Sequence, residues 1–287
     1  MDFKSIYKNG NIITKLIFIN IVVFAVVKLV SIAFLLFNIS TVSLLPYLAM
    51  PAEISTFLMR FWTAISYMFL HEEFFHLFFN MMCLYWFGKI ALSFLNEKQL
   101  IGLYLLGGIM GGALYLISYN LFPFYEQHVG NSLLLGASGA IMAIMVATAM
   151  LAPNMEMMLM LIGRVKLKYV AMATVLISLF GITGGNAGGE LAHLGGALAG
   201  YIYVSMYRGG KDISLFFTRI FDTISGLFTP KMKQKKTKFH YQAPMNDADF
   251  NQRKAKKSAN VDAILDKIKR SGYESLTPDE KQKLFEK

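Results

Sequence analysis

Charged residues are scarce in this chain of 287 residues: they make up 16% of it, against about 25% in water-soluble domains. Apolar residues take their place, at 55%, with 24 phenylalanines among them. The mean hydropathy is +0.47. This shortage of charge excludes an ordinary soluble domain and predicts a membrane protein.

Cysteine is also nearly absent. The single one, Cys83, lies within an apolar run, so no disulfide framework can form and a buried, unreactive thiol is expected. The apolar runs are continuous and do not alternate with period two, which favours membrane helices over a β-barrel.

Six apolar runs have about the length that crosses 30 Å of hydrocarbon. They cover approximately residues 16–37, 66–88, 99–119, 136–152, 169–185 and 189–207. The predicted fold is all-α: a polytopic membrane protein with a bundle of six transmembrane helices over residues 16–207. A short N-terminus, 1–15, precedes the bundle, and a tail, 208–287, follows it.

The positions of lysine and arginine predict the orientation of the bundle. With a cytoplasmic N-terminus, the outer loops carry only Arg60. The inner segments then carry Lys4, Lys8, Lys15, Lys89, Lys98, Arg164, Lys166 and Lys168. Both termini are therefore expected in the cytoplasm. The first run is too long for a cleaved signal peptide, and no organelle-targeting feature is present, so a bacterial plasma (inner) membrane is the predicted location.

The tail is basic, with 18 Lys and Arg against 10 Asp and Glu. Its lysine-rich runs, 231–240 and 253–257, predict attraction to anionic lipid headgroups. No nucleic-acid partner is expected, because no aromatic residues are interleaved with the lysines as a stacking platform.

Residues 261–285 of the tail predict a small helical hairpin. Gly272 is placed to end a first amphipathic helix. Thr277 and Glu280 have the spacing of a capping box, and Pro278 suits the first turn of a second helix.

Several polar residues lie within the apolar runs, where each is costly and indicates function by default. The second run holds His71, His76 and Asn80, the fourth begins at Ser138, and the sixth holds His193. Runs two, four and six point the same way through the membrane. These residues are therefore expected at a similar depth near the outer face.

Ser138 has the surroundings of a nucleophile. Unpaired backbone N–H groups and the positive end of the dipole at a helix start favour a developing oxyanion. Gly136 and Gly139 leave room for the backbone of a substrate. His193 is the candidate base, and Gly189, Gly196 and Gly200 predict that its helix approaches that of Ser138 closely.

Simpler interpretations compete with this one. Gly-x-Ser-Gly alone is weak evidence, because small residues are common where membrane helices meet. The segment HEEFFH suggests metal, but His71 and His76 are five residues apart and no third ligand is evident, so no metal is predicted. Glu72, Glu73 and Glu190 are most simply solvated.

Taken in order, the motifs HEEFFHLFFNM, GASGA and AHLGGALAG on runs two, four and six resemble those of the rhomboid intramembrane serine proteases. The resemblance implies a dyad without a third acidic member, in which Ser138 is the nucleophile and His193 the general base. It also implies that His76 and Asn80 form the oxyanion hole together with the Ser138 backbone N–H.

Two positions depart from the family. Many relatives carry Trp-Arg in the first outer loop, whereas here Thr63 follows Trp62 and the nearest arginine is Arg60. Some bacterial relatives have a tyrosine one turn after the serine, stacked on the histidine, and here this residue is Met142. His193 then has to be oriented by other contacts.

The predicted function is that of an intramembrane serine endopeptidase without a cofactor. The resemblance implies substrates that are single-span membrane proteins, cut near the outer face where glycine or proline weakens their helix. The alternative is a catalytically silent rhomboid-like protein that binds membrane clients. A transporter is a more distant alternative, because no inverted repeat is visible.

Overall fold

The computed structural model describes residues 10–39, 43–159, 163–216 and 247–285 of the chain. The chain divides into two compact units, Met1–Pro230 and Lys231–Lys287, and each is described by itself. Residues 1–9 of the predicted N-terminus and the basic run 231–240 lie outside the described residues.

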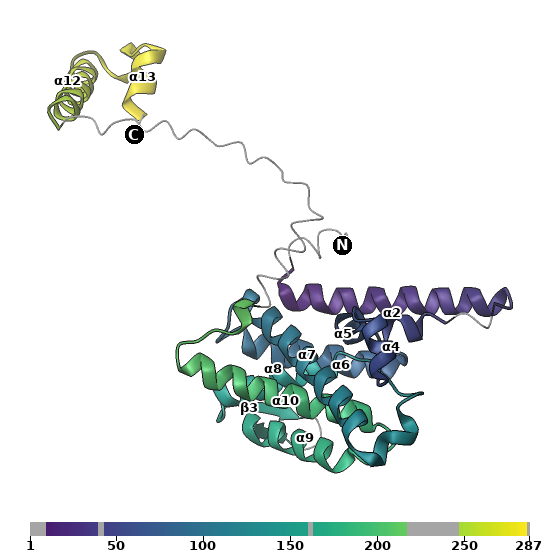
Figure 1. Ribbon diagram of the computed structural model, residues 1–287. Helices are drawn as coiled ribbons and strands as arrows, with labels where there is room; N and C mark the ends of the chain where they lie inside the picture. The colour runs from purple at the N-terminus through teal and green to yellow at the C-terminus, as the bar shows by residue number, and fades with distance from the viewer. Residues whose placement is uncertain (1–9, 40–42, 160–162, 217–246, 286–287) are drawn as a thin grey trace. The chain divides into compact units, whose positions relative to one another are not determined.

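The first unit is mostly helical, as the sequence predicts, and a helix lies in each of the six apolar runs (Figure 1). These helices are α2 (Ile12–Leu36), α6 (Phe74–Ala91), α7 (Glu97–Leu121), α8 (Ser138–Leu151), α9 (Leu167–Gly181) and α10 (Ala187–Arg208). The largest difference is at the start of α6, which was expected near residue 66. Residues 63–69 instead form two short turns, α5 (Thr63–Ser66) and η1 (Tyr67–Phe69).

Not every one of these helices passes a test of length and hydropathy for a membrane span. Within the described residues, α2 and α7 pass it, while α8 and α9 are shorter apolar helices. The 14 residues of α8 extend over about 21 Å, less than the hydrocarbon thickness of about 30 Å. The arrangement as six transmembrane spans therefore stays a prediction.

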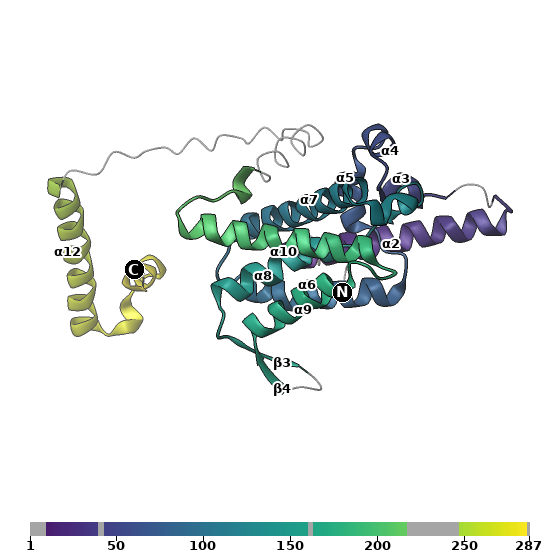
Figure 2. The ribbon, with the colours of Figure 1, turned by 60° about the horizontal axis from the view of Figure 1, so that its bottom comes forward.

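Glycine allows α7, α8 and α10 to pack closely at the centre of the unit (Figures 1 and 2). A Cβ atom on Gly196 of α10 would overlap the carbonyl oxygen of Gly139 in α8, and one on Gly200 would overlap that of Ala143. The predicted small-residue seam is confirmed for these two glycines. Gly189 differs, because its nearest neighbour is the side chain of Asn186 at the start of its own helix.

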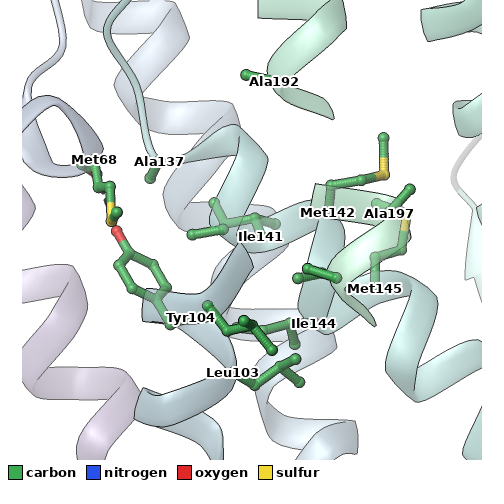
Figure 3. Packing of buried hydrophobic residues seen from close by; sticks show 14 of the residues in the cluster. Met68, Leu103, Tyr104, Ala137, Ile141, Met142, Ile144, Met145, Ala192 and Ala197 are labelled. Carbon is green, nitrogen blue, oxygen red and sulfur yellow. Dashed lines mark hydrogen bonds between the residues drawn. The ribbon is translucent and has the colours of Figure 1, made fainter. Parts of the chain in front are cut away.

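The side chains of α8 are buried on almost all sides. Ile144 points toward Leu103 of α7, whereas Met142 and Met145 lie on the side of Ala197 in α10 (Figure 3). The helix that begins at Ser138 is thus the central element of the core. Its burial fixes the direction in which the serine points.

The segment between α2 and α6 packs over the start of α8. It contains α3 (Leu45–Leu48), β1 (Met50–Pro51) and α4 (Ile54–Met59). Strand β1 pairs antiparallel with β2 (Leu133–Leu134), which lies just before Ser138. In this segment Trp62 Nε1 donates to the Tyr47 carbonyl at 2.8 Å and Arg60 donates to that of Pro46 at 2.7 Å.

Short strands are an addition to the all-α prediction. Between α8 and α9, β3 (Glu156–Leu159) and β4 (Gly163–Lys166) form an antiparallel hairpin that extends away from the helices in Figure 2. A further turn, η2 (Pro123–His128), precedes β2. None of these elements is long enough to show a clear period of two in the sequence, which explains why they were not predicted.

The second unit contains α12 (Asp247–Ser271), η3 (Tyr273–Ser275) and α13 (Pro278–Phe285). The first helix begins at residue 247, earlier than the expected 261, and Gly272 follows its end with φ +75°. The predicted capping box is present: the Thr277 N–H donates to Glu280 at 2.8 Å, and the Glu280 N–H donates to Thr277 Oγ1 at 3.3 Å.

Candidate active site

Four predicted site residues line one cavity of about 350 Å³, the serine cavity. His76 and Asn80 come from α6, Ser138 from α8 and His193 from α10. The remaining lining residues are Phe79, Cys83, Leu135, Ile141, Met142, Met145, Thr174, Asn186 and Gly189. Residues more than 110 positions apart in the sequence thus face one space at the end of the bundle where α6, α8 and α10 begin.

Two hydrogen bonds hold the turn before Ser138. The Gly136 N–H donates to the carbonyl of Tyr67 at 2.9 Å, and the Ala137 N–H lies 3.5 Å from Nε2 of His71. Gly136 has φ +117°, which strains any residue with a side chain. No side chain caps the helix at Ala137. Because no side chain caps α8, the backbone N–H groups in its first turn, beginning at Ser138, remain available to a ligand.

His76 lies directly beside this turn. A Cβ atom on Gly136 would be 2.9 Å from Nε2 of His76 and 3.8 Å from Oγ of Ser138. The imidazole and the hydroxyl therefore both lie close to the Cβ position of the same glycine. Gly136 is needed both for its backbone conformation and for the space that the imidazole occupies.

Asn80 is one turn further along α6. Its Nδ2 donates to the His76 carbonyl at 2.9 Å, which uses one of its two hydrogens and holds the amide in place. The second hydrogen on Nδ2 can be donated to another acceptor. His76 and Asn80 thus both line the serine cavity from one helix, as their spacing predicts.

His71 does not line the serine cavity. It is buried behind the turn, and its ring centroid is 5.0 Å from that of His76. Its Nδ1 has no hydrogen-bond partner among the described residues. Within the described residues no group of three or more His, Cys, Asp or Glu could hold a metal ion. His71 supports the turn before Ser138 and does not reach the space beside it.

Gly139 lies at the contact between α8 and α10. A Cβ atom there would be 3.1 Å from the carbonyl oxygen of Ala192 in α10. Sequence analysis placed Gly136 and Gly139 against a substrate. In the structure Gly136 lies against His76 and Gly139 against α10, so both glycines also make room inside the protein. Their role in leaving room for a substrate stays a prediction.

His193 is held from the side by two residues that sequence analysis did not assign to the site. Its Nδ1 lies 3.2 Å from Oε2 of Glu190 and 3.1 Å from Oγ of Ser178 in α9. The side chain of Glu190 is only 19% exposed, so the prediction that it is solvated was wrong. Its position three residues before His193, on one face of a helix, was the signal available in the sequence.

Met142 lies four residues after Ser138, about one turn further along α8. It is 3% exposed and lines the serine cavity without an aromatic ring to stack on His193. Among the described residues, the hydrogen-bonding atoms beside Nδ1 of the imidazole are those of Glu190 and Ser178.

An apolar helical bundle with a serine, two histidines and an asparagine around one cavity defines a class of membrane protein with a serine–histidine site between its helices. The comparison with protein families agrees. The family model "Rhomboid domain" matches residues 58–209, more than half of the chain, and the chain belongs to the rhomboid family. It is therefore an integral membrane protein.

A curated relative and a second family model add to this. The chain is 31% identical over 139 residues to "Presenilin-associated rhomboid-like protein A, mitochondrial" from Danio rerio. This match covers 47% of the chain and 35% of the relative, so the chain spans only about a third of that protein's length. Residues 246–286 match a family of unknown function (DUF6576), which corresponds to the second compact unit.

Proposed function

We propose that this protein is an intramembrane serine endopeptidase. The observation that carries the proposal is the serine cavity, where a serine at an uncapped helix start shares a space with a histidine and two further side-chain donors. Membership of the rhomboid family supports the same reaction class. No cofactor is needed for it.

The reaction is acyl transfer. Ser138 Oγ attacks a peptide carbonyl carbon while its proton passes to Nε2 of His193. The oxyanion accepts hydrogen bonds from the Ser138 N–H and the side chains of His76 and Asn80. The C–N bond then breaks as His193 gives its proton to the leaving amine. Water, deprotonated by His193, attacks the acyl ester, which yields a carboxylic acid and restores Ser138.

The substrates are single-span membrane proteins that enter from the side of α6 and α9. The serine cavity reaches this side, since Phe79 and Cys83 of α6 and Thr174 of α9 line it. The outward faces of both helices are apolar, with exposed Phe78 on α6 and exposed Ile177 on α9. A segment rich in glycine or proline fits best, because a stable helix conceals its carbonyls.

We also propose a location and an orientation for the protein in the membrane. The six apolar helices cross a bacterial plasma membrane, with both termini in the cytoplasm and the serine cavity toward the outer face. The basic tail then meets the anionic headgroups of the inner leaflet. The short α8 supports this placement, because a 14-residue helix that reaches the inner surface begins below the outer one.

Labelling by a fluorophosphonate probe in detergent tests the proposal. The purified protein should be labelled at Ser138 and should cleave a model single-span substrate, and Ser138→Ala should do neither. A folded wild-type protein that is neither labelled nor able to cleave would support the alternative, a silent binder of membrane clients.

A further inference from the structure

The pair of oxygens behind His193 has no counterpart in a dyad. Nδ1 of His193 lies 3.2 Å from Glu190 Oε2 and 3.1 Å from Ser178 Oγ. Both neighbours are held within the protein, since Ser178 is 1% exposed and the Glu190 side chain 19%. Glu190 is therefore enclosed between α9 and α10 and is not a solvated carboxylate at a helix end.

The contact between α9 and α10 is shaped around Glu190. A Cβ atom on Gly181 of α9 would be 2.9 Å from Cγ of Glu190, so the glycine leaves the space in which the side chain lies. Ser178 is three residues before Gly181 and Glu190 three before His193, which places each pair on one face of its helix. The contact between α9 and α10 therefore consists, at this point, of Gly181 and Ser178 from α9 and Glu190 and His193 from α10.

The chemistry of these groups determines where the imidazole carries its hydrogen. An ionised carboxylate only accepts hydrogen bonds, so the hydrogen of a neutral imidazole lies on Nδ1, toward Glu190. Nε2 then has a free lone pair, which is what a general base requires. The opposite tautomer would place two acceptors, Nδ1 and the carboxylate, against each other.

We propose that Glu190, together with Ser178, positions His193 as the base by fixing its Nδ1–H tautomer and ring orientation. This inference rests on the proposed endopeptidase function. Glu190 is a positioning residue, because it acts through the imidazole and touches no substrate. Its negative charge also favours the imidazolium that forms when Ser138 gives up its proton.

Four variants test the proposal: Glu190→Ala, Glu190→Gln, Ser178→Ala and, as a matched control, Glu126→Gln, which changes an exposed glutamate in η2. Glu190→Ala should lower kcat by about 10- to 100-fold with KM within about twofold, as expected when a general base loses its orientation. Glu190→Gln keeps an oxygen that can accept from Nδ1–H and should lose less. Ser178→Ala should lose least, and the control should equal wild type.

Fluorophosphonate labelling and thermal unfolding complete the test. The labelling rate of Ser138 should fall in parallel with kcat, while the melting temperatures stay close to that of wild type. Wild-type kcat and labelling in folded Glu190→Ala would overturn the proposal, as would a change confined to KM. If Glu190→Ala does not fold, wild-type kcat in Glu190→Gln and Ser178→Ala overturns it. An inactive, unlabelled wild-type protein would instead contradict the endopeptidase function itself.

Discussion

At the scale of single residues, the residues in and around the serine cavity have two kinds of proposed role: some react, and others hold the reacting residues in position. In the proposed reaction Ser138 and His193 carry the atoms that change their bonds, whereas His71 and Gly136 hold the turn that presents the serine. These roles predict different consequences of substitution. Loss of a reacting group should stop the reaction and leave packing nearly unchanged.

Ser138→Ala and His193→Ala should therefore each abolish cleavage of a model single-span substrate. Neither change removes a large buried apolar volume, so expression and melting temperature should remain near those of wild type. Cleavage is measured with purified protein, with contaminating protease excluded by mass spectrometry. Retained turnover in Ser138→Ala would show that another residue is the nucleophile.

His76 and Asn80 should affect the transition state without being essential. Each alanine replacement should lower turnover by about 10- to 1,000-fold, the loss expected for one oxyanion donor. If both donors serve one oxygen, the double variant should lose less than the product of the two single losses. Wild-type rates in both single variants would place the oxyanion elsewhere.

At the scale of elements, the contact of α8 with α10 brings Ser138 and His193 to one cavity. Gly196→Ala places a methyl group on the carbonyl oxygen of Gly139, where backbone leaves no flexible side chain to move aside. We expect a loss of about 1–3 kcal/mol in the free energy of unfolding. Gly185→Ala is the control, because nothing lies within 4 Å of its Cβ position. Thermal unfolding in detergent that is equal for both variants would contradict this packing.

In the second unit, the Glu280 carboxylate of α13 accepts hydrogen bonds from Lys267 of α12. Lys267 Nζ donates to Glu280 at 2.8 Å, and this bond, followed by that from the Thr277 N–H, lowers the pKa of Glu280 from 4.5 to about 2. A depressed pKa stabilises the folded state above pH 4.5, and that stability is lost as pH falls toward 2.

Hydrogen exchange of the α13 amides in the full chain measures this effect. Their protection should fall between pH 4.5 and 2, after correction for intrinsic exchange, and Glu280→Gln should have reduced protection already at pH 7. Because the side chain of Glu280 is still 28% exposed and its ion pair is screened by solvent, the change should be small. Protection in Glu280→Gln equal to that of wild type would exclude a stabilising role.

The sequence predicts features that depend on a local pattern, such as an apolar run or a motif. It does not predict residue roles that arise only when one helix packs on another. Continuous apolar runs predict α7 and α10, and the order of the motifs predicts that Ser138 and His193 meet. Ser178 gives no such signal, because it is one serine in an apolar helix and gains a role only when α9 packs on α10. The interpretation of Glu190 failed for the same reason: its burial comes from α9, in particular the space at Gly181.

At the scale of the whole molecule, the question is where the membrane unit ends. The sequence places the change near residue 208, but the structure extends the contacts of the first unit further. Gln99 Nε2 donates to Asp212 at 2.7 Å, and Ser214 is fully buried, with its Cβ against Gly102 of α7. A cut at about residue 210 would therefore remove part of the packing at the start of α7, so a truncation should spare Ser214.

Truncation after Phe216 should leave turnover of a detergent-solubilised substrate within a few-fold of full length. The proposed topology puts the tail on the cytoplasmic side, whereas Ser138 and His193 lie toward the outer face, so a direct contact would have to cross most of the bilayer. Truncation after Gly210 is the comparison, and it should have a lower melting temperature because Asp212 and Ser214 are gone. In cells the shorter chain can still change in abundance, because the lysines of the tail are gone and no longer contact anionic lipid.

The decisive measurement is turnover of the purified chain ending at Phe216, matched for folded fraction. A loss of 100-fold or more would mean that the second unit organises the serine cavity, and the division into a membrane enzyme and a separable tail would have to be abandoned.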